Sequence, residues 1–180
     1  MSMFALQVKT RDEEKYIKLF YAHNPGTKHV RIYFPKRELR IRKQGKTITK
    51  IAPVFSGYIF VELENEDHIM NHYLSLRGVS GFIRFLPSNK KVRALKSDDL
   101  ELAVHFIRQL NQVASVSKVY FDENDKIVIT EGPLLGLEGR IVKIDRRKGR
   151  AKIRLDLYGD SFAVDLSFVM IEPAAPVKAS

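Results

Sequence analysis

The sequence predicts an α+β fold in two parts, a ferredoxin-like α/β sandwich followed by a small β-barrel. The first 110 residues alternate apolar strand patterns with amphipathic helix patterns in the order strand, helix, paired strands, helix, strand, helix. The helical pattern fades over residues 111–125, which are small and polar at their centre. Beyond them, short alternating strands are joined by glycine-rich turns, which is typical of a small barrel.

Each element of the first part has its own signal. Thr10 and Glu13 form the pattern of a capping box, which predicts where the first helix begins. Ser97, followed by Asp98 and Asp99, favours the start of the last helix, because acidic side chains stabilise the positive end of the helix dipole. In chain order we expect a strand over 3–9, a helix ending at 24–26, a strand over 29–35, a pair of strands over 37–51, a central strand within 54–63, a helix over 66–75, a strand from 81 and the last helix from 97.

The stretch RELRIRKQGKTITKI, residues 37–51, predicts two strands around a turn at Gln44–Lys46. Its apolar positions are few and the others are charged or polar, so it cannot be buried on both faces. We therefore expect a basic ribbon that projects from the domain.

In the second part, Ala151, Ile153, Leu155 and Leu157 alternate with polar residues, which predicts a strand with one buried face. We place the first domain at 1–112, a linker at 113–123, the barrel at 124–173 and a tail at 174–180.

Positive charge is concentrated in the first part of the chain. The net charge is +10; residues 1–121 carry 21 Lys and Arg against 11 Asp and Glu, whereas residues 122–173 carry nine against ten. Glu38 is the single acid between Lys28 and Lys50. Such a field attracts nucleic acid, although a solvated charged face is the alternative interpretation.

The sequence gives no sign of catalysis. The chain has no cysteine, which excludes disulfides and thiolate metal sites. His68 and His72 share a helical spacing, but Ile69 stands where a zinc protease needs glutamate, and Asp98 and Asp99 point apart on a helix. No apolar run is long enough for a membrane helix. We expect a cytoplasmic monomer that is not an enzyme, with no cofactor, no metal and no membrane partner.

Two groups of motifs carry a family resemblance. The segment EGPLLGLEGRIVKIDRRKGRAKIRLDLYG, residues 131–159, resembles the KOW motif of an SH3-like barrel. Upstream, FPKRE (34–38), VFSGYIFVEL (54–63) and RGVSGFI (77–83) resemble the N-terminal domain of the NusG family. Both occur in the family's order, and the basic ribbon resembles that of specialised antitermination paralogs such as the LoaP group. Asp160 departs from the family, in which the position after the YG turn is often basic.

The resemblance implies a bacterial transcription elongation and antitermination factor that modulates pausing and termination. Its first domain would bind the clamp helices of the largest RNA polymerase subunit, with Phe55 and Tyr58 as anchors and Met3 and Phe4 at the edge. The alternative is a ribosome-associated KOW-type RNA-binding protein, which should lack the 54–63 segment.

Two further surfaces are expected from the resemblance and the charges. The nucleic-acid contacts, to DNA at the polymerase cleft or to structured RNA, would come from Lys36, Arg37, Arg40, Arg42, Lys43 and Lys46 in the ribbon and from Arg146, Arg147, Lys148, Arg150 and Lys152 in the barrel. A protein partner of the barrel, such as Rho or a small-subunit ribosomal protein, would contact Leu134, Leu137, Leu157 and Tyr158.

Overall fold

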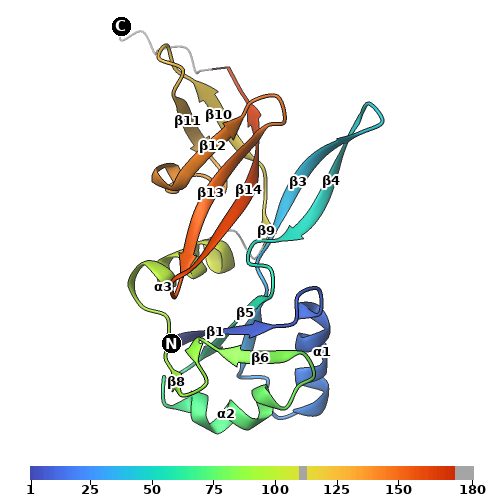
Figure 1. Ribbon diagram of the computed structural model, residues 1–180, viewed down its shortest axis with the longest axis vertical. Helices are drawn as coiled ribbons and strands as arrows, with labels where there is room; N and C mark the ends of the chain where they lie inside the picture. The colour runs from blue at the N-terminus through green and yellow to red at the C-terminus, as the bar shows by residue number, and fades with distance from the viewer. Residues whose placement is uncertain (110–112, 173–180) are drawn as a thin grey trace, which may run out of the picture. The chain divides into compact units, whose positions relative to one another are not determined.

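The computed structural model describes residues 1–109 and 113–172 and divides the chain into two compact units. Unit 1 contains Met1–Lys36, Pro53–Val113 and Asp156–Phe162, and unit 2 contains Arg37–Ala52, Ala114–Leu155 and Ala163–Ser180. Figure 1 shows the helices and strands and labels most of them.

Unit 1 is built on a four-stranded sheet in the order β2-β5-β1-β6, and the three strand pairs are antiparallel. This is the strand order of a ferredoxin-like sandwich, so the predicted fold class is confirmed. Its elements are β1 (Ser2–Val8), α1 (Glu13–His23), β2 (Arg31–Tyr33), β5 (Tyr58–Leu63), α2 (His68–Arg77), β6 (Phe82–Phe85), the short β7 (Pro87–Ser88) and β8 (Lys91–Val92), and α3 (Ser97–Val104), which continues as a π-helix over His105–Gln109.

Helices α1 and α2 pack on one face of this sheet. Tyr16 and Phe20 of α1 are buried with Leu6 of β1, Ile59 of β5 and Leu76 of α2 in one apolar cluster. The Tyr16 hydroxyl donates a hydrogen bond of 2.5 Å to the Leu76 carbonyl and so joins the two helices. Because the buried hydroxyl has an acceptor, it avoids the desolvation cost of an unpaired donor, and the bond fixes how the two helices pack.

The start of α1 differs from the predicted capping box. The helix begins at Glu13, and Asp12 occupies the cap position without a side-chain hydrogen bond to the helix. The Glu13 carboxylate instead accepts a hydrogen bond of 2.7 Å from the Gly57 backbone N–H, so a long-range contact replaces the local one.

Unit 2 holds a five-stranded sheet in the order β11-β10-β14-β13-β12. Its strands are β10 (Ser117–Phe121), β11 (Ile127–Glu131), β12 (Ile141–Asp145), β13 (Arg150–Leu157) and β14 (Asp160–Met170), with a 3₁₀ turn at Glu138–Arg140. The alternating burial of β13 confirms the predicted inward face. The basic ribbon, β3 (Lys36–Lys43) and β4 (Lys46–Pro53), forms a three-stranded sheet with β9 (Val113–Ala114) in the order β4-β3-β9.

The predicted linker differs from the structure, whereas α3 begins at Ser97 as predicted. Residues 113–123 include β9 and β10, and Val119 of β10 is fully buried. Small serine residues made this strand look like a linker in the sequence. In the structure Ser117 is buried, and its hydroxyl accepts a hydrogen bond of 3.0 Å from the Leu134 N–H. The predicted tail at 174–180 lies outside the described residues.

Candidate functional site

An aromatic face occupies the side of the unit 1 sheet opposite α1 and α2. In the strand register, Met3 faces Glu62, Ala5 faces Phe60 and Gln7 faces Tyr58, so these side chains share one face. The intervening residues of both strands belong to the helix-covered core. The sheet therefore separates two apolar layers.

Phe55 lies at the centre of this face. Its ring contacts those of Phe60, Phe106 and Phe162 edge-on, with centroids 5.4, 5.8 and 5.5 Å apart. Phe162 also contacts Tyr58 at 5.0 Å. These perpendicular arrangements are favourable because the positive edge of one ring meets the negative face of the next.

The segment 156–162 covers this aromatic face within unit 1. Asp160 accepts a hydrogen bond of 2.8 Å from the Tyr58 hydroxyl and pairs with Arg84 at 3.2 Å. The Tyr158 hydroxyl lies 2.7 Å from the Arg93 carbonyl and 2.8 Å from that of Ala94. We call Asp156–Phe162 the covering segment.

Burial and charge shift two tyrosines in this arrangement. Burial, reinforced by the carboxylate of Asp99, raises the pKa of Tyr158 to about 12. Burial and the hydrogen bond to Asp160 also raise the pKa of Tyr58. Both hydroxyls therefore stay protonated at neutral pH and can donate the hydrogen bonds that hold the covering segment.

A buried carboxylate stands at the other end of the aromatic face. Glu62 accepts a hydrogen bond of 2.7 Å from Tyr33 and pairs with Arg31 at 3.5 Å and with Arg108. Burial alone would raise the pKa of Glu62, but the hydrogen bonds from Tyr33 and Arg108 and the two arginine charges together lower it. Glu62 is therefore charged at neutral pH and ties the π-helix to the sheet.

The four residues expected to bind polymerase are buried in this structure. Met3, Phe55 and Tyr58 lie on the aromatic face, with 2%, 0% and 7% of their surfaces exposed. Phe4 lies on the opposite face, in the core beneath α1 and α2. The structure thus brings three of the four together; Phe106 and Phe162 belong to the same cluster but were missed, because they are distant in sequence.

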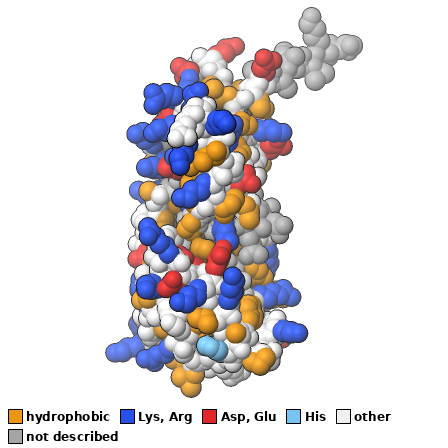
Figure 2. All heavy atoms as spheres, turned by 90° about the vertical axis from the view of Figure 1, so that its right-hand side faces the viewer, with side chains coloured by type: hydrophobic (Ala, Val, Ile, Leu, Met, Phe, Trp, Pro, Cys, Tyr) orange, Lys and Arg blue, Asp and Glu red, His pale blue; other side chains and the backbone are white. Residues whose placement is uncertain are grey.

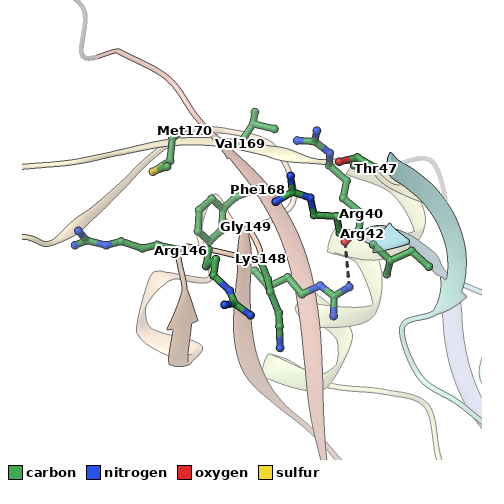
Figure 3. A pocket seen from close by; sticks show the side chains of 12 residues that line it. Arg40, Arg42, Thr47, Arg146, Lys148, Gly149, Phe168, Val169 and Met170 are labelled. Carbon is green, nitrogen blue, oxygen red and sulfur yellow. Dashed lines mark hydrogen bonds between the residues drawn. The ribbon is translucent and has the colours of Figure 1, made fainter. Parts of the chain in front are cut away.

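A basic cleft lies within unit 2. It has a volume of about 880 Å³ and is lined by cationic side chains from the ribbon and from the turn between β12 and β13: Arg40, Arg42, Arg146, Arg147, Lys148 and Arg150. Figure 3 shows Arg40, Arg42 and Thr47 of the ribbon together with the turn at Gly149. Two separately predicted basic groups therefore meet in one site. Figure 2 views the molecule from the side of the ribbon, and lysine and arginine side chains are spread over the upper part of this view.

The remaining predicted basic residues lie outside the lining of the cleft. Lys36 pairs with Glu14 of α1, and Lys152 lies 4.0 Å from Asp165. Lys43 and Lys46 are exposed near the tip of the ribbon, whereas Arg37 is partly buried. Burial lowers the pKa of Arg37 and the charge of Arg150 lowers it further, although Asp165 opposes the shift.

The expected protein-partner surface of the barrel is not exposed. Leu134, Leu137 and Leu157 are buried, with at most 6% of their surfaces accessible. Tyr158 belongs to the covering segment and is hydrogen-bonded there. Leucines in a small barrel fill its core first, which explains their burial.

His68 and His72 both lie on α2, and His29 joins them. The His72 Nε2 atom lies 3.1 Å from that of His29, a contact that sequence spacing does not reveal. Burial lowers the pKa of His72, and the neighbouring His29 and His68 add to this. Among the described residues, no group of three or more His, Cys, Asp or Glu side chains could hold a metal ion. None of the described helices is both long and apolar enough to span a membrane.

A family model and several known proteins match this chain over much of its length. The family model described as "Transcription termination factor nusG" matches residues 1–104. The NusG protein of Helicobacter pylori is 22% identical over 178 residues, covering 96% of this chain and 98% of that protein. The NusG proteins of Campylobacter jejuni and Bacillus subtilis are 26% and 25% identical, over 78% and 79% of this chain and 77% and 78% of theirs. All three are named transcription termination/antitermination proteins.

A solved structure gives the same fold. The structure described as "Domain interaction in Thermotoga maritima NusG" matches with a TM-score of 0.57 at 22% identity, covering 92% of this chain and 93% of that one. The likeness spans both the sandwich and the barrel.

Proposed function

Because this chain belongs to the NusG family of transcription termination and antitermination factors, we propose that unit 1 binds RNA polymerase through its aromatic face. The binding partner is the pair of clamp helices in the largest polymerase subunit. A factor held there modulates pausing and termination during elongation. The observation that carries the proposal is the cluster around Phe55.

The aromatic face has the composition of an interface anchor. Phe55, Tyr58 and Phe106 gather on one side of the sheet, away from the main core beneath α1 and α2. Aromatic residues dominate binding energy where they fill a desolvated patch on a partner. An amphipathic helix pair supplies the complementary apolar surface.

Binding at this face requires the covering segment to leave. Asp160 contacts Tyr58 and Arg84, and Tyr158 contacts Asp99 and two backbone carbonyls, so these polar contacts must break. Asp160 and Arg84 keep 42% and 37% of their side chains exposed, so their ion pair is weakened by solvent. A cover held by such contacts is displaceable by a partner that buries the same aromatic rings.

Unit 2 then recruits a further partner. The family resemblance implies Rho or a small-subunit ribosomal protein for this role. Such a partner would contact the exposed surface of the barrel and not its buried leucines.

The proposal is tested by binding full-length protein to isolated clamp helices. Asp160→Ala serves as the common background, because it removes the bond between Asp160 and Tyr58 in every sample. In that background, Tyr58→Ala should weaken binding by about 1–3 kcal/mol, the range for a buried aromatic anchor. The matched control is Tyr73→Ala, whose ring stacks on Phe85. Equal affinities for the two variants, each shown to be folded, would exclude the aromatic face as the docking site.

A further inference from the structure

We propose that the basic cleft of unit 2 binds one single strand of nucleic acid, which contacts the β3–β4 ribbon and the β12–β13 turn at the same time. This inference concerns unit 2 and does not depend on polymerase docking by unit 1. The ligand is defined by its chemistry, a single sugar–phosphodiester chain with unpaired bases, and the test distinguishes RNA from DNA.

Specific backbone contacts build the cleft. Arg150 donates a hydrogen bond of 3.0 Å to the Arg40 carbonyl, drawn as a dashed line in Figure 3. The Arg40 N–H donates to the Ser167 hydroxyl at 3.0 Å, and the Phe168 N–H donates to the Gly149 carbonyl at 2.8 Å. The ribbon, the turn and β14 are thereby joined around one space.

Glycine is required at the turn. Gly149 has φ +60°, and a Cβ atom there would lie 2.6 Å from the Phe168 carbonyl oxygen. Only a residue without a side chain lets the turn approach β14 this closely. The turn therefore holds Arg147 and Lys148 at a fixed position beside the ribbon.

The positive charge of the cleft is only partly compensated. Arg146 pairs with Asp125 at 3.0 Å and Lys148 with Asp145 at 3.6 Å. Within residues 1–109 and 113–172, Arg40, Arg42 and Arg147 form no ion pair, although the charge of Arg147 acts on Asp145. The Nε atom of Arg150 is buried and has no hydrogen-bond partner within the same ranges. Cations gathered in this way repel one another, and a bound phosphate chain would offset that repulsion.

The cleft also offers surfaces for bases. The Arg146 guanidinium lies over the Phe121 ring, 3.7 Å from its centre, and also donates hydrogen bonds to Asp125. The outer face of such a stack is a platform for an unpaired base. Met170, with 61% of its surface exposed, adds an apolar contact on the lining. Bases are available to these groups only in a single strand, since a duplex keeps them stacked inside.

The test measures binding of fluorescent oligonucleotides of about ten nucleotides to the full chain, within the size range of single-strand sites. Three probes share one sequence: RNA, DNA, and the DNA annealed to its complement. If the strand neutralises about four of the cleft's cations, the logarithmic salt slope is about −2.8, or about a 50-fold loss of affinity between 50 and 200 mM salt. Single-stranded RNA or DNA should bind more tightly than the duplex. The tighter of the two single strands shows whether the cleft prefers RNA or DNA. A duplex bound equally well or better would overturn the proposal.

Two single variants decide whether the site is composite. Arg42→Glu on the ribbon and Arg147→Glu on the turn should each reduce the slope by about 0.7, and the double variant by about 1.4. The matched control is Lys15→Glu with Lys18→Glu, which makes the same charge change on exposed positions of α1. One oligonucleotide should bind per chain. Loss of binding in only one of the single variants, two bound oligonucleotides, or an equal effect of the α1 control would overturn the proposal.

Discussion

Replacing Asp160 with alanine should strengthen polymerase binding. The Asp160 carboxylate holds the covering segment through the Tyr58 hydroxyl at 2.8 Å and through Arg84 at 3.2 Å. A hydrogen bond to a charged group contributes about 1.5–3 kcal/mol, and a half-exposed ion pair about 0.2–1 kcal/mol. Because both contacts are partly solvated, we take the lower end of each range. We expect the substitution to make closure of the covering segment over the aromatic face less favourable by about 2 kcal/mol.

This loss converts directly into an affinity change. A binding site that is open for only a fraction of the time has its affinity reduced by that fraction. Weakening the cover by about 2 kcal/mol raises the open fraction by up to about 30-fold. Titration of the isolated clamp helices with Asp160→Ala should therefore give a dissociation constant up to about 30-fold lower than that of the wild type.

Two further variants check the reasoning. Asp165→Ala makes the same substitution on the same strand, but Asp165 pairs with Lys152 in unit 2, so this variant should leave clamp-helix binding unchanged. Phe162→Ala removes the ring that contacts Phe55 and Tyr58 and should strengthen binding in the same direction as Asp160→Ala. If Asp160→Ala and Phe162→Ala both bind no more tightly than the wild type, the covering segment does not limit access to the aromatic face.

Two stability predictions follow from single contacts. Gly132→Ala should destabilise unit 2 by more than about 2 kcal/mol in urea unfolding, because a Cβ at its φ of +97° would lie 2.5 Å from the Ser117 Cα. The control is Gly136→Ala, which has no atom within 4 Å of its Cβ and should destabilise unit 2 by only about 1 kcal/mol. Equal losses of stability in the two variants would contradict the argument from crowding. The lowered pKa of Glu62 means that its stabilising contribution is present above the unfolded-state pKa and is lost as the pH falls through the folded-state pKa. Unfolding measured from pH 7 to pH 3 should show the wild type losing its advantage over Glu62→Gln below about pH 4.5, and parallel curves would refute this assignment.

Local patterns in the sequence predicted many of the helices and strands, but not β9 and β10. The alternation over residues 151–157 and the turn at Gln44 and Gly45 both match the structure. Both signals depend on neighbours within a few residues, where side-chain periodicity is a direct consequence of backbone geometry. The strand order of unit 1 then follows from the element order and the connection rules.

Contacts between distant parts of the chain could not be predicted in this way. Arg150 and the Arg40 carbonyl are 110 positions apart, and Tyr58 and Asp160 are 102 positions apart. The same limit explains the missed strand β10, since Ser117 is buried only because Leu134 and Gly132 close over it. Asp160 illustrates the point most clearly: its charge looked like a departure from the family, and in the structure it is the acceptor for Tyr58.

The hairpin of β13 and β14 supplies residues to both proposed sites. Its first strand begins at Arg150, in the cleft, and its second strand ends at Met170, also in the cleft. Its tip carries Tyr158, Asp160 and Phe162, which form the covering segment over the aromatic face. One continuous hairpin therefore contributes residues to the covering segment and to the lining of the cleft. Any coupling between the two ligands must then be reciprocal: if a bound strand of nucleic acid favours release of the tip, polymerase binding strengthens nucleic-acid binding by the same factor.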